Sequence, residues 1–199
     1  MCTSAFQPCI PTRAPKVPHQ AEWLHEIKHD GYRLIVQREG KRVRLFTRNG
    51  HDWSDKYPLI AEAALRIRST SFVLDGEAVL LGVDSISDFD GLHSRKHNDE
   101  VQFYAFDLLV DRGEDVRGLP LHLRKNSLAR LLARRVDGIL LLDYEQGEIG
   151  PDLYRHAWLL GLEGIVSKHR DRPYRPGRSS HWLKVKNPTS PAMLRAKDG

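Results

Sequence analysis

The chain has 199 residues, of which 40% are hydrophobic, 29% are charged and 8% are aromatic, and this composition excludes collagen, coiled coils and wholesale disorder. Its longest purely apolar runs, such as residues 139–142, are far shorter than the roughly 20 residues of a membrane-spanning helix, so no membrane partner is expected. The first 20 residues hold no apolar signal stretch, and Cys2 and Cys9 are the only cysteines. A cytoplasmic location follows as the expectation.

Positive charge is concentrated at the C-terminal end. The formal net charge is +5, and residues 163–199 contain nine basic and three acidic side chains. The preceding 162 residues contain 22 basic and 23 acidic side chains, so they are nearly balanced. This distribution indicates that the C-terminal end contacts phosphates, in a nucleotide, a nucleic acid or both. A solvated basic tail is the alternative.

The predicted elements begin with an extended arm. Pro8, Pro11, Pro15 and Pro18 lie within the first 20 residues, and proline at this density predicts neither helix nor sheet ladders. Two strands that flank Gly40 then predict a β-hairpin. The predicted elements in chain order are strands at 33–38 and 42–47, a helix at 57–68, strands at 72–81 and 101–110, an amphipathic helix at 124–135 with its basic groups on the polar face, a strand at 138–143, a helix at 150–161, and strands at 164–168 and 182–186.

These elements predict an α+β fold. Strands outnumber helices and cluster without a β-α-β rhythm, which favours two mainly antiparallel β-sheets flanked by helices. The expected parts are a Pro-rich arm (1–20), one domain (21–188) and a short tail (189–199) that is frayed from residue 192 onward. Neither a P-loop nor a Rossmann glycine motif occurs in the sequence.

Several predicted strands carry ionised side chains among apolar ones. Asp75 and Glu77 interrupt one such strand, Glu163 precedes another, and Lys184 and Lys186 alternate along the last. Ionised groups on buried strands are costly unless they are paired or bound to a metal. The pattern therefore predicts a polar cleft between two sheets. A set of unrelated charges at strand edges is the alternative.

Lys28 alone would read as a surface lysine before the turn at Gly31. Together with five further motifs, however, its Lys-x-Asp-Gly segment resembles the nucleophile motif of the covalent nucleotidyltransferases, which are ATP-dependent DNA ligases, RNA ligases and mRNA capping enzymes. The further motifs follow in the family's order and are Phe-Thr-Arg-Asn-Gly (46–50), Asp-Gly-Glu (75–77), Tyr-Ala-Phe-Asp (104–107), Glu-Gly-Ile-Val-Ser-Lys (163–168) and Trp-Leu-Lys-Val-Lys (182–186). The sequence most resembles the adenylation domain of bacterial ATP-dependent DNA ligases, including the ligase module of end-joining enzymes, over about residues 7–187.

The resemblance implies a nucleotidyltransferase (ATP-grasp-like) fold with the active site between the sheets. It implies ATP as substrate, with AMP as a covalent intermediate, and Mg²⁺ or Mn²⁺ as metal. The implied partner is nicked double-stranded DNA, in DNA repair at the bacterial nucleoid, and the expected oligomeric state is a monomer.

The resemblance also assigns roles to residues of the first motifs. Lys28 matches the nucleophile that becomes lysyl-AMP, and Glu26 matches the residue that recognises the adenine amino group. Arg33 corresponds to the ribose contact and Phe106 to the ring that stacks on adenine, although Phe106 in a plain apolar core is the alternative. Arg48 matches the residue that holds the 5′-phosphate of the nick.

Roles for the remaining charged residues follow in the same way. Glu77 resembles a carboxylate for ribose or metal and Glu163 the acid of the metal site, while Lys168, Lys184 and Lys186 resemble phosphate ligands. A lysine attacks phosphorus only as a neutral amine, and burial and nearby cations lower the pKa of a lysine from its ordinary ~10.4. Structural roles are expected for Asp30, Asp75 and Asp107, as acceptors of hydrogen bonds from backbone amides of turns or strands. Packing roles are expected for Tyr32, Tyr104 and Trp182.

Two other groups of residues give weaker signals. His93 and His97 have the spacing of a helix, but their polar neighbours predict a loop, so a zinc site is not expected. A basic loop contains four arginines that either contact a DNA backbone or are solvated: Arg170, Arg172, Arg175 and Arg178.

The sequence departs from the family after its last motif. Ligases of this family carry a small OB-fold barrel there, whereas this chain ends thirteen residues after Lys186. The expectation is therefore that no C-terminal OB-fold is present, and that formation of lysyl-AMP is weak or depends on a partner that contains an OB-fold. An RNA ligase or capping-type enzyme, and a non-catalytic module that binds nucleotides or nicks, are the alternatives.

Overall fold

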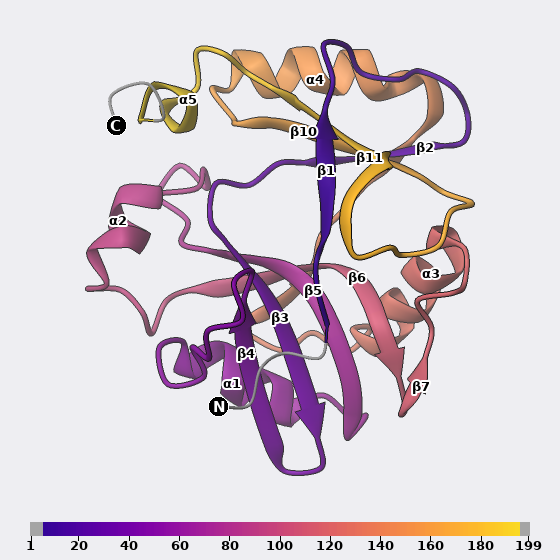
Figure 1. Ribbon diagram of the computed structural model, residues 1–199. Helices are drawn as coiled ribbons and strands as arrows, with labels where there is room; N and C mark the ends of the chain where they lie inside the picture. The colour runs from indigo at the N-terminus through magenta and orange to yellow at the C-terminus, as the bar shows by residue number, and fades with distance from the viewer. Residues whose placement is uncertain (1–5, 196–199) are drawn as a thin grey trace.

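The computed structural model describes residues 6–195, which form two β-sheets with helices packed on their outer faces (Figure 1). Sheet A consists, in spatial order, of β1 (Cys9–Arg13), β11 (Gly177–Lys186), β10 (Gly164–His169), β2 (Trp23–Ile27) and β9 (Glu145–Gln146). Sheet B consists of β4 (Arg42–Thr47), β3 (Tyr32–Glu39), β5 (Ser71–Val79), β6 (Gln102–Asp111) and β7 (Glu114–Asp115), and β8 (Ile139–Leu141) pairs with β6. Only the β1–β11 and β6–β8 pairs among these strands are parallel. The predicted α+β fold with two mainly antiparallel sheets is therefore confirmed.

The helices cover the two sheets from opposite sides. Helix α4 lies against β10 and β2 of sheet A, whereas α1 and α3 lie against sheet B. The helices are α1 (Pro58–Arg66), α2 (Phe89–Ser94), α3 (Leu121–Leu131), α4 (Gly150–Leu159) and α5 (Pro191–Arg195), with a short 3₁₀ turn at Gly147–Ile149. None of the helices in the described part of the chain is long and apolar enough to span a membrane.

Sheet B is buried on both faces, and the alternation of its side chains between the two faces determines which way its charged residues point. Along β3, Leu34 and Val36 pack into the core shared with α1, whereas Ile35 packs into a second core shared with sheet A. On β5, Val73 joins that second core. Because side chains alternate along a strand, Asp75 and Glu77 have the same orientation as Val73 and face sheet A.

The N-terminal arm corrects one prediction, because β1 pairs with β11 in a sheet ladder. Pro11 is tolerated there because β1 is an edge strand, where one row of backbone donors needs no partner. The register shifts between Pro11 and Thr12, which is consistent with a local bulge at the proline.

Three other expectations are wrong. The basic groups of the helix predicted at 124–135 do not all lie on a solvated face, because α3 buries Arg124 and Lys125, whereas Arg130 is exposed. The expected frayed tail is helical up to Arg195, whose guanidinium pairs with Asp30, and residues 196–199 lie outside the described part of the chain. A loop was expected around His93 and His97, but His93 lies in helix α2 and only His97 lies after the helix.

Candidate active site

A cavity with a volume of about 160 Å³ lies between the two sheets. It is lined by eight of the predicted site residues, namely Glu26, Lys28, Arg33, Arg48, Glu77, Phe106, Lys168 and Lys184. Glu163 and Lys186 are not in its lining, but both form ion pairs that connect them to Lys28. The fold thus brings all ten predicted site residues to one region.

Lys28 follows β2, and its amide donates to the Gly164 carbonyl of β10. Its amine donates to Glu163 Oε2 at 2.5 Å, while Lys186 Nζ lies 2.9 Å from Oε1 of the same carboxylate. The carboxylate is 5% exposed, and burial opposes its charge, but the two amines lower the pKa of Glu163 overall. Glu163 is therefore an anion held between two cations.

Gly164 allows this approach of the strands. Its φ of +137° is unfavourable for other residues, and a Cβ at this position would lie 2.1 Å from the Val185 carbonyl oxygen. The close contact between β10 and β11 keeps Glu163 beside Lys186 at the end of the sheet.

Glu77 approaches this group from sheet B. Burial raises the pKa of Glu77 to about 7, against the attraction of Lys28 and Arg33. Lys184, on β11, also has its pKa lowered, first by burial and then by Lys186 and Lys28. Arg48 is exposed at the rim of the cavity.

Glu26 lies at a second, fully buried cluster in the cavity. Its carboxylate accepts a hydrogen bond from Lys125, and its Oε2 lies 2.6 Å from Lys168 Nζ. The Lys168 amine also lies 3.9 Å from the centroid of the Phe106 ring and 4.0 Å from that of Trp182. Burial lowers the pKa of Lys168 to about 8. Lys168 thus lies beside Glu26 and the two rings, and not in the ion-paired group of Lys28.

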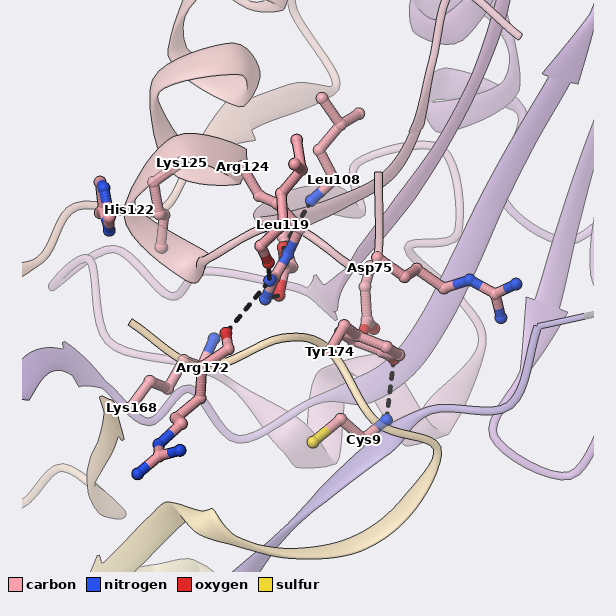
Figure 2. A network of polar contacts seen from close by, with 12 residues as sticks. Cys9, Asp75, Leu108, Leu119, His122, Arg124, Lys125, Lys168, Arg172 and Tyr174 are labelled. Carbon is pink, nitrogen blue, oxygen red and sulfur yellow. Dashed lines mark hydrogen bonds and ion pairs between the residues drawn. The ribbon is translucent and has the colours of Figure 1, made fainter. Parts of the chain in front are cut away.

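Arg33 is fixed by a buried network that joins the sheets. Its Nε and Nη2 donate to Asp75 at 2.5 and 2.6 Å, and Nη2 also donates to the Cys9 carbonyl. The Tyr174 hydroxyl donates to Asp75 at 2.6 Å and accepts from the Cys9 amide at 2.8 Å, as Figure 2 shows. Arg33 lies 4.4 Å from the centroid of the Phe106 ring. Asp75 is therefore structural, as predicted, but it binds side chains and not the expected backbone amides.

Asp107 also binds a side chain. Arg124 donates to both of its oxygens at 2.8 and 2.9 Å, and neither side chain is exposed. Asp107 also accepts from the amide of Leu108, which is the kind of contact that the sequence predicts. Arg124 further donates to the carbonyls of Leu119 and Arg172, so it anchors the loop that precedes β11 (Figure 2).

Some residues that line the cavity or pair with its lining residues were not identified from the sequence. Lys125 gave no signal, because its position on α3 predicted solvent exposure. His29 lines the cavity and stacks on Tyr104, and Trp182 lines it although only packing was expected. The arm contributes Pro8, Ile10 and Pro11 to the wall.

The donor set suits a hard cation bound partly by its substrate. Within residues 6–195, no group of three or more His, Cys, Asp or Glu side chains is arranged so that it could hold a metal ion by itself. Two carboxylates lie here, and the charge of Glu163 adds to the burial that raises the pKa of Glu77. Mg²⁺ prefers oxygen ligands and usually keeps several waters, so one or two carboxylates with substrate phosphates are sufficient.

Comparison with known proteins gives a consistent result. The family model described as "ATP dependent DNA ligase domain" matches residues 10–186. The multifunctional non-homologous end joining protein LigD of Pseudomonas aeruginosa is 37% identical over 172 residues, which are 85% of this chain and 20% of that protein. A probable DNA ligase of Streptomyces coelicolor is 32% identical over 90% of this chain and 39% of its own length. The chain thus spans only a fifth to two fifths of these two relatives.

Solved structures agree with the sequence matches. Mycobacterial DNA ligase D complexed with ATP and MES has a TM-score of 0.81 and 31% identity, over 90% of this chain and 60% of the other. The ligase domain of Mycobacterium tuberculosis LigD has a TM-score of 0.79 at the same identity, over 90% of this chain and 59% of the other. With a family model that matches nearly the whole chain, these results show that the protein belongs to the family of ATP-dependent DNA ligase domains.

Proposed function

We propose that the chain transfers AMP from ATP to Lys28, and then from Lys28 to the 5′-phosphate of nicked DNA in DNA repair. The observation that supports this function most directly is the group of Lys28, Glu163 and Lys186 at the edge of the cavity between the sheets. Membership of the ligase family supports ATP as the nucleotide.

The cavity has groups suited to each part of a nucleoside phosphate. Glu26 and Phe106 provide a hydrogen-bonding carboxylate and an apolar ring for adenine, and Arg33, fixed by Asp75, is available to the ribose. Lys184 and Lys186 are the cations for the phosphates. Lys168 lies beside the groups proposed for the base, so its role as a phosphate ligand would require its amine to leave Glu26.

The first step forms a bond between Lys28 Nζ and the α-phosphorus of ATP and breaks the bond from that phosphorus to pyrophosphate. The nitrogen loses a proton, for which Glu163 Oε2 is an acceptor at 2.5 Å. In the second step a 5′-phosphate oxygen attacks the same phosphorus, and the P–N bond breaks as the nitrogen regains a proton. Attack of the 3′-hydroxyl on the 5′-phosphate then releases AMP and seals the strand.

We propose Glu77 and Glu163 as the residues that hold Mg²⁺ or Mn²⁺. The bound cation would neutralise phosphate charge during the transfer. Arg48, at the rim, is proposed to bind the 5′-phosphate of the nick. We also propose that an OB-fold domain, from a partner protein or from another part of a longer chain, assists the first step at the nucleoid.

Mass spectrometry after incubation with ATP and Mg²⁺ tests the proposal. We expect one AMP adduct on the wild-type chain and none on Lys28→Ala, while the matched control Lys16→Ala, at an exposed arm position, keeps the adduct. An adduct that persists in a folded Lys28→Ala variant would contradict the assigned nucleophile. Sealing of pre-adenylated nicked DNA by the wild-type chain tests the later step separately.

A further inference from the structure

A second cavity lies far from the candidate active site. Its volume is about 770 Å³, and it is lined by Arg68, Ser69, Thr70, Ser71, Asp111, Arg112, Ser127, Arg130 and Leu131. Ser71 begins β5 and Glu77 lies six residues further along it, so the two cavities are separated by roughly 20 Å along that strand. Figure 1 draws β7 at the end of sheet B that points away from sheet A.

Three arginines from separate segments meet in this arginine cleft, as we call it. Arg68 precedes β5, Arg112 lies in the β6–β7 turn, and Arg130 is on α3. All three are exposed, and among residues 6–195 none of them forms an ion pair with a carboxylate. Asp111 is the single acid of the lining, so the arginine cleft has a formal charge of +2.

Neutral donors accompany the arginines. The hydroxyl-bearing residues Ser69, Thr70, Ser71 and Ser127 line the same cavity. The Ser69 hydroxyl donates to the Ser71 carbonyl, and Arg130 donates to the Ser127 hydroxyl. A planar guanidinium with several N–H donors matches the oxygens of a phosphate, and hydroxyls add further hydrogen bonds. The combination of unpaired guanidinium groups and hydroxyls is therefore suited to a phosphate ligand.

The backbone at Arg112 is strained. Its φ is 51°, in the left-handed region, and it precedes Gly113 in the two-residue turn between β6 and β7. Asn or Gly is the usual residue at this position of such a turn, and another residue there costs about 1–2 kcal/mol. Despite this cost the turn has an arginine at this position, and Arg112 lines the arginine cleft.

We propose that the arginine cleft binds phosphate groups of the DNA sugar–phosphate backbone, outside the nick. DNA as the source of the phosphates rests on the proposed function, whereas an anion site at this place does not. An extended polyanion suits the site because the arginine cleft is wide, open and lined from three separate segments.

Fluorescence anisotropy with intact and nicked duplex DNA at several KCl concentrations tests this proposal. For the triple variant Arg68→Ala, Arg112→Ala and Arg130→Ala, we expect at least a fivefold loss of affinity. The slope of log affinity against log salt should become shallower by about 2 to 3, because up to three phosphate contacts are lost. A control of equal charge carries alanine at the exposed residues Lys16, Lys96 and Arg155. The control should lose less than twofold.

Calorimetry with inorganic phosphate and with pyrophosphate distinguishes a free anion from DNA. Loss of phosphate binding with unchanged DNA affinity would support the site with a free anion as its ligand. If neither DNA nor anion binding changes in the folded triple variant, the proposal is overturned. The triple arginine-to-lysine variant retains the charge and should recover most of the salt slope. The triple arginine-to-glutamine variant removes the charge but keeps polar side chains, and it replaces the alanine variant if that protein does not fold.

Formation of lysyl-AMP in the same proteins separates this proposal from the function proposed above. The triple variant should form the adduct at the wild-type rate, because the arginine cleft shares no residue with the active-site cavity. An absent adduct in the wild-type chain would count against the catalytic function alone.

Discussion

His29 lies next to the candidate nucleophile, in surroundings that oppose a charged imidazole. Burial and the positive charge of Lys28 lower the pKa of His29 to about 4, although Glu26 acts in the opposite direction. The ring stacks on Tyr104, and its Nδ1 lies 3.2 Å from the Ser87 hydroxyl. The folded protein therefore keeps this histidine neutral.

The lowered pKa of His29 predicts a loss of stability in acid. Between pH 6.5 and about 4 the unfolded chain binds a proton at His29 that the folded chain does not, so the free energy of unfolding falls as the pH falls. The full contribution is at most about 3 kcal/mol. Urea unfolding at pH 7 and pH 4.5 should show a smaller decline for His29→Gln than for the wild type. Equal declines would contradict the assignment.

The residues predicted for the site lie together in the structure, but the sequence did not predict all of their partners. Glu77, Glu163, Lys184 and Lys186 could be recognised because they interrupt or flank apolar strands. Lys28 and the other charged residues of the site were assigned by the resemblance to the family. Lys125 could not be recognised, because a lysine on an amphipathic helix gives the same pattern whether it is solvated or pairs with a buried acid such as Glu26. Only the tertiary contact between α3 and β2 distinguishes the two cases.

Among the strands, β10 can pack closely against β11 only because its first residue, Gly164, has no side chain. Gly164 combines a positive φ with a backbone oxygen at the position of a Cβ, whereas Gly177 has a positive φ of 80° and open space around it. Alanine substitutions at these two glycines therefore distinguish the cost of steric overlap from the cost of backbone strain.

Gly164→Ala should lower the free energy of unfolding by more than about 2 kcal/mol, because strain and overlap add. Gly177→Ala should lower it by about 1 kcal/mol, from strain alone. Chemical denaturation of both variants measures the difference. Gly164→Ala should also slow formation of lysyl-AMP, because Glu163 would be displaced from Lys28. Equal effects of the two substitutions on stability would contradict this account.

The longer elements of sheet B and helices α1, α3 and α4 followed from alternation and turn residues, whereas β1, β2, α2, α5 and the two-residue strands β7 and β9 were not predicted. Proline density indicated an arm without sheet pairing because Pro11 lacks a backbone donor. An edge strand needs only one of its two rows of backbone groups, so Pro11 fits when the missing donor faces outward. The edge position of β1 depends on its pairing with residues 177–186, which are far away in sequence. The local sequence pattern therefore does not indicate that position.

In the whole molecule, Arg124 and Asp107 link sheet B to the loop before β11. Breaking a buried ion pair by removing one partner typically costs about 3–5 kcal/mol, because the remaining charge is left unpaired. Arg124→Met should therefore lower the free energy of unfolding by that amount.

The double variant Arg124→Met with Asp107→Leu should be at least about 2 kcal/mol more stable than the sum of the two single effects predicts. Urea unfolding of the four proteins in this cycle gives the coupling. Additive effects would show that the ion pair contributes no coupling.

The order of the strands along the chain has a consequence for protein synthesis. Sheet B uses residues 32–141, whereas sheet A combines residues 9–27 with residues 145–186. A nascent chain on the ribosome can complete sheet B while sheet A still lacks β10 and β11. Lys28 emerges early, but Glu163 and Lys186 emerge among the last residues. We therefore expect that a chain interrupted during translation exposes Lys28 but does not form lysyl-AMP from ATP.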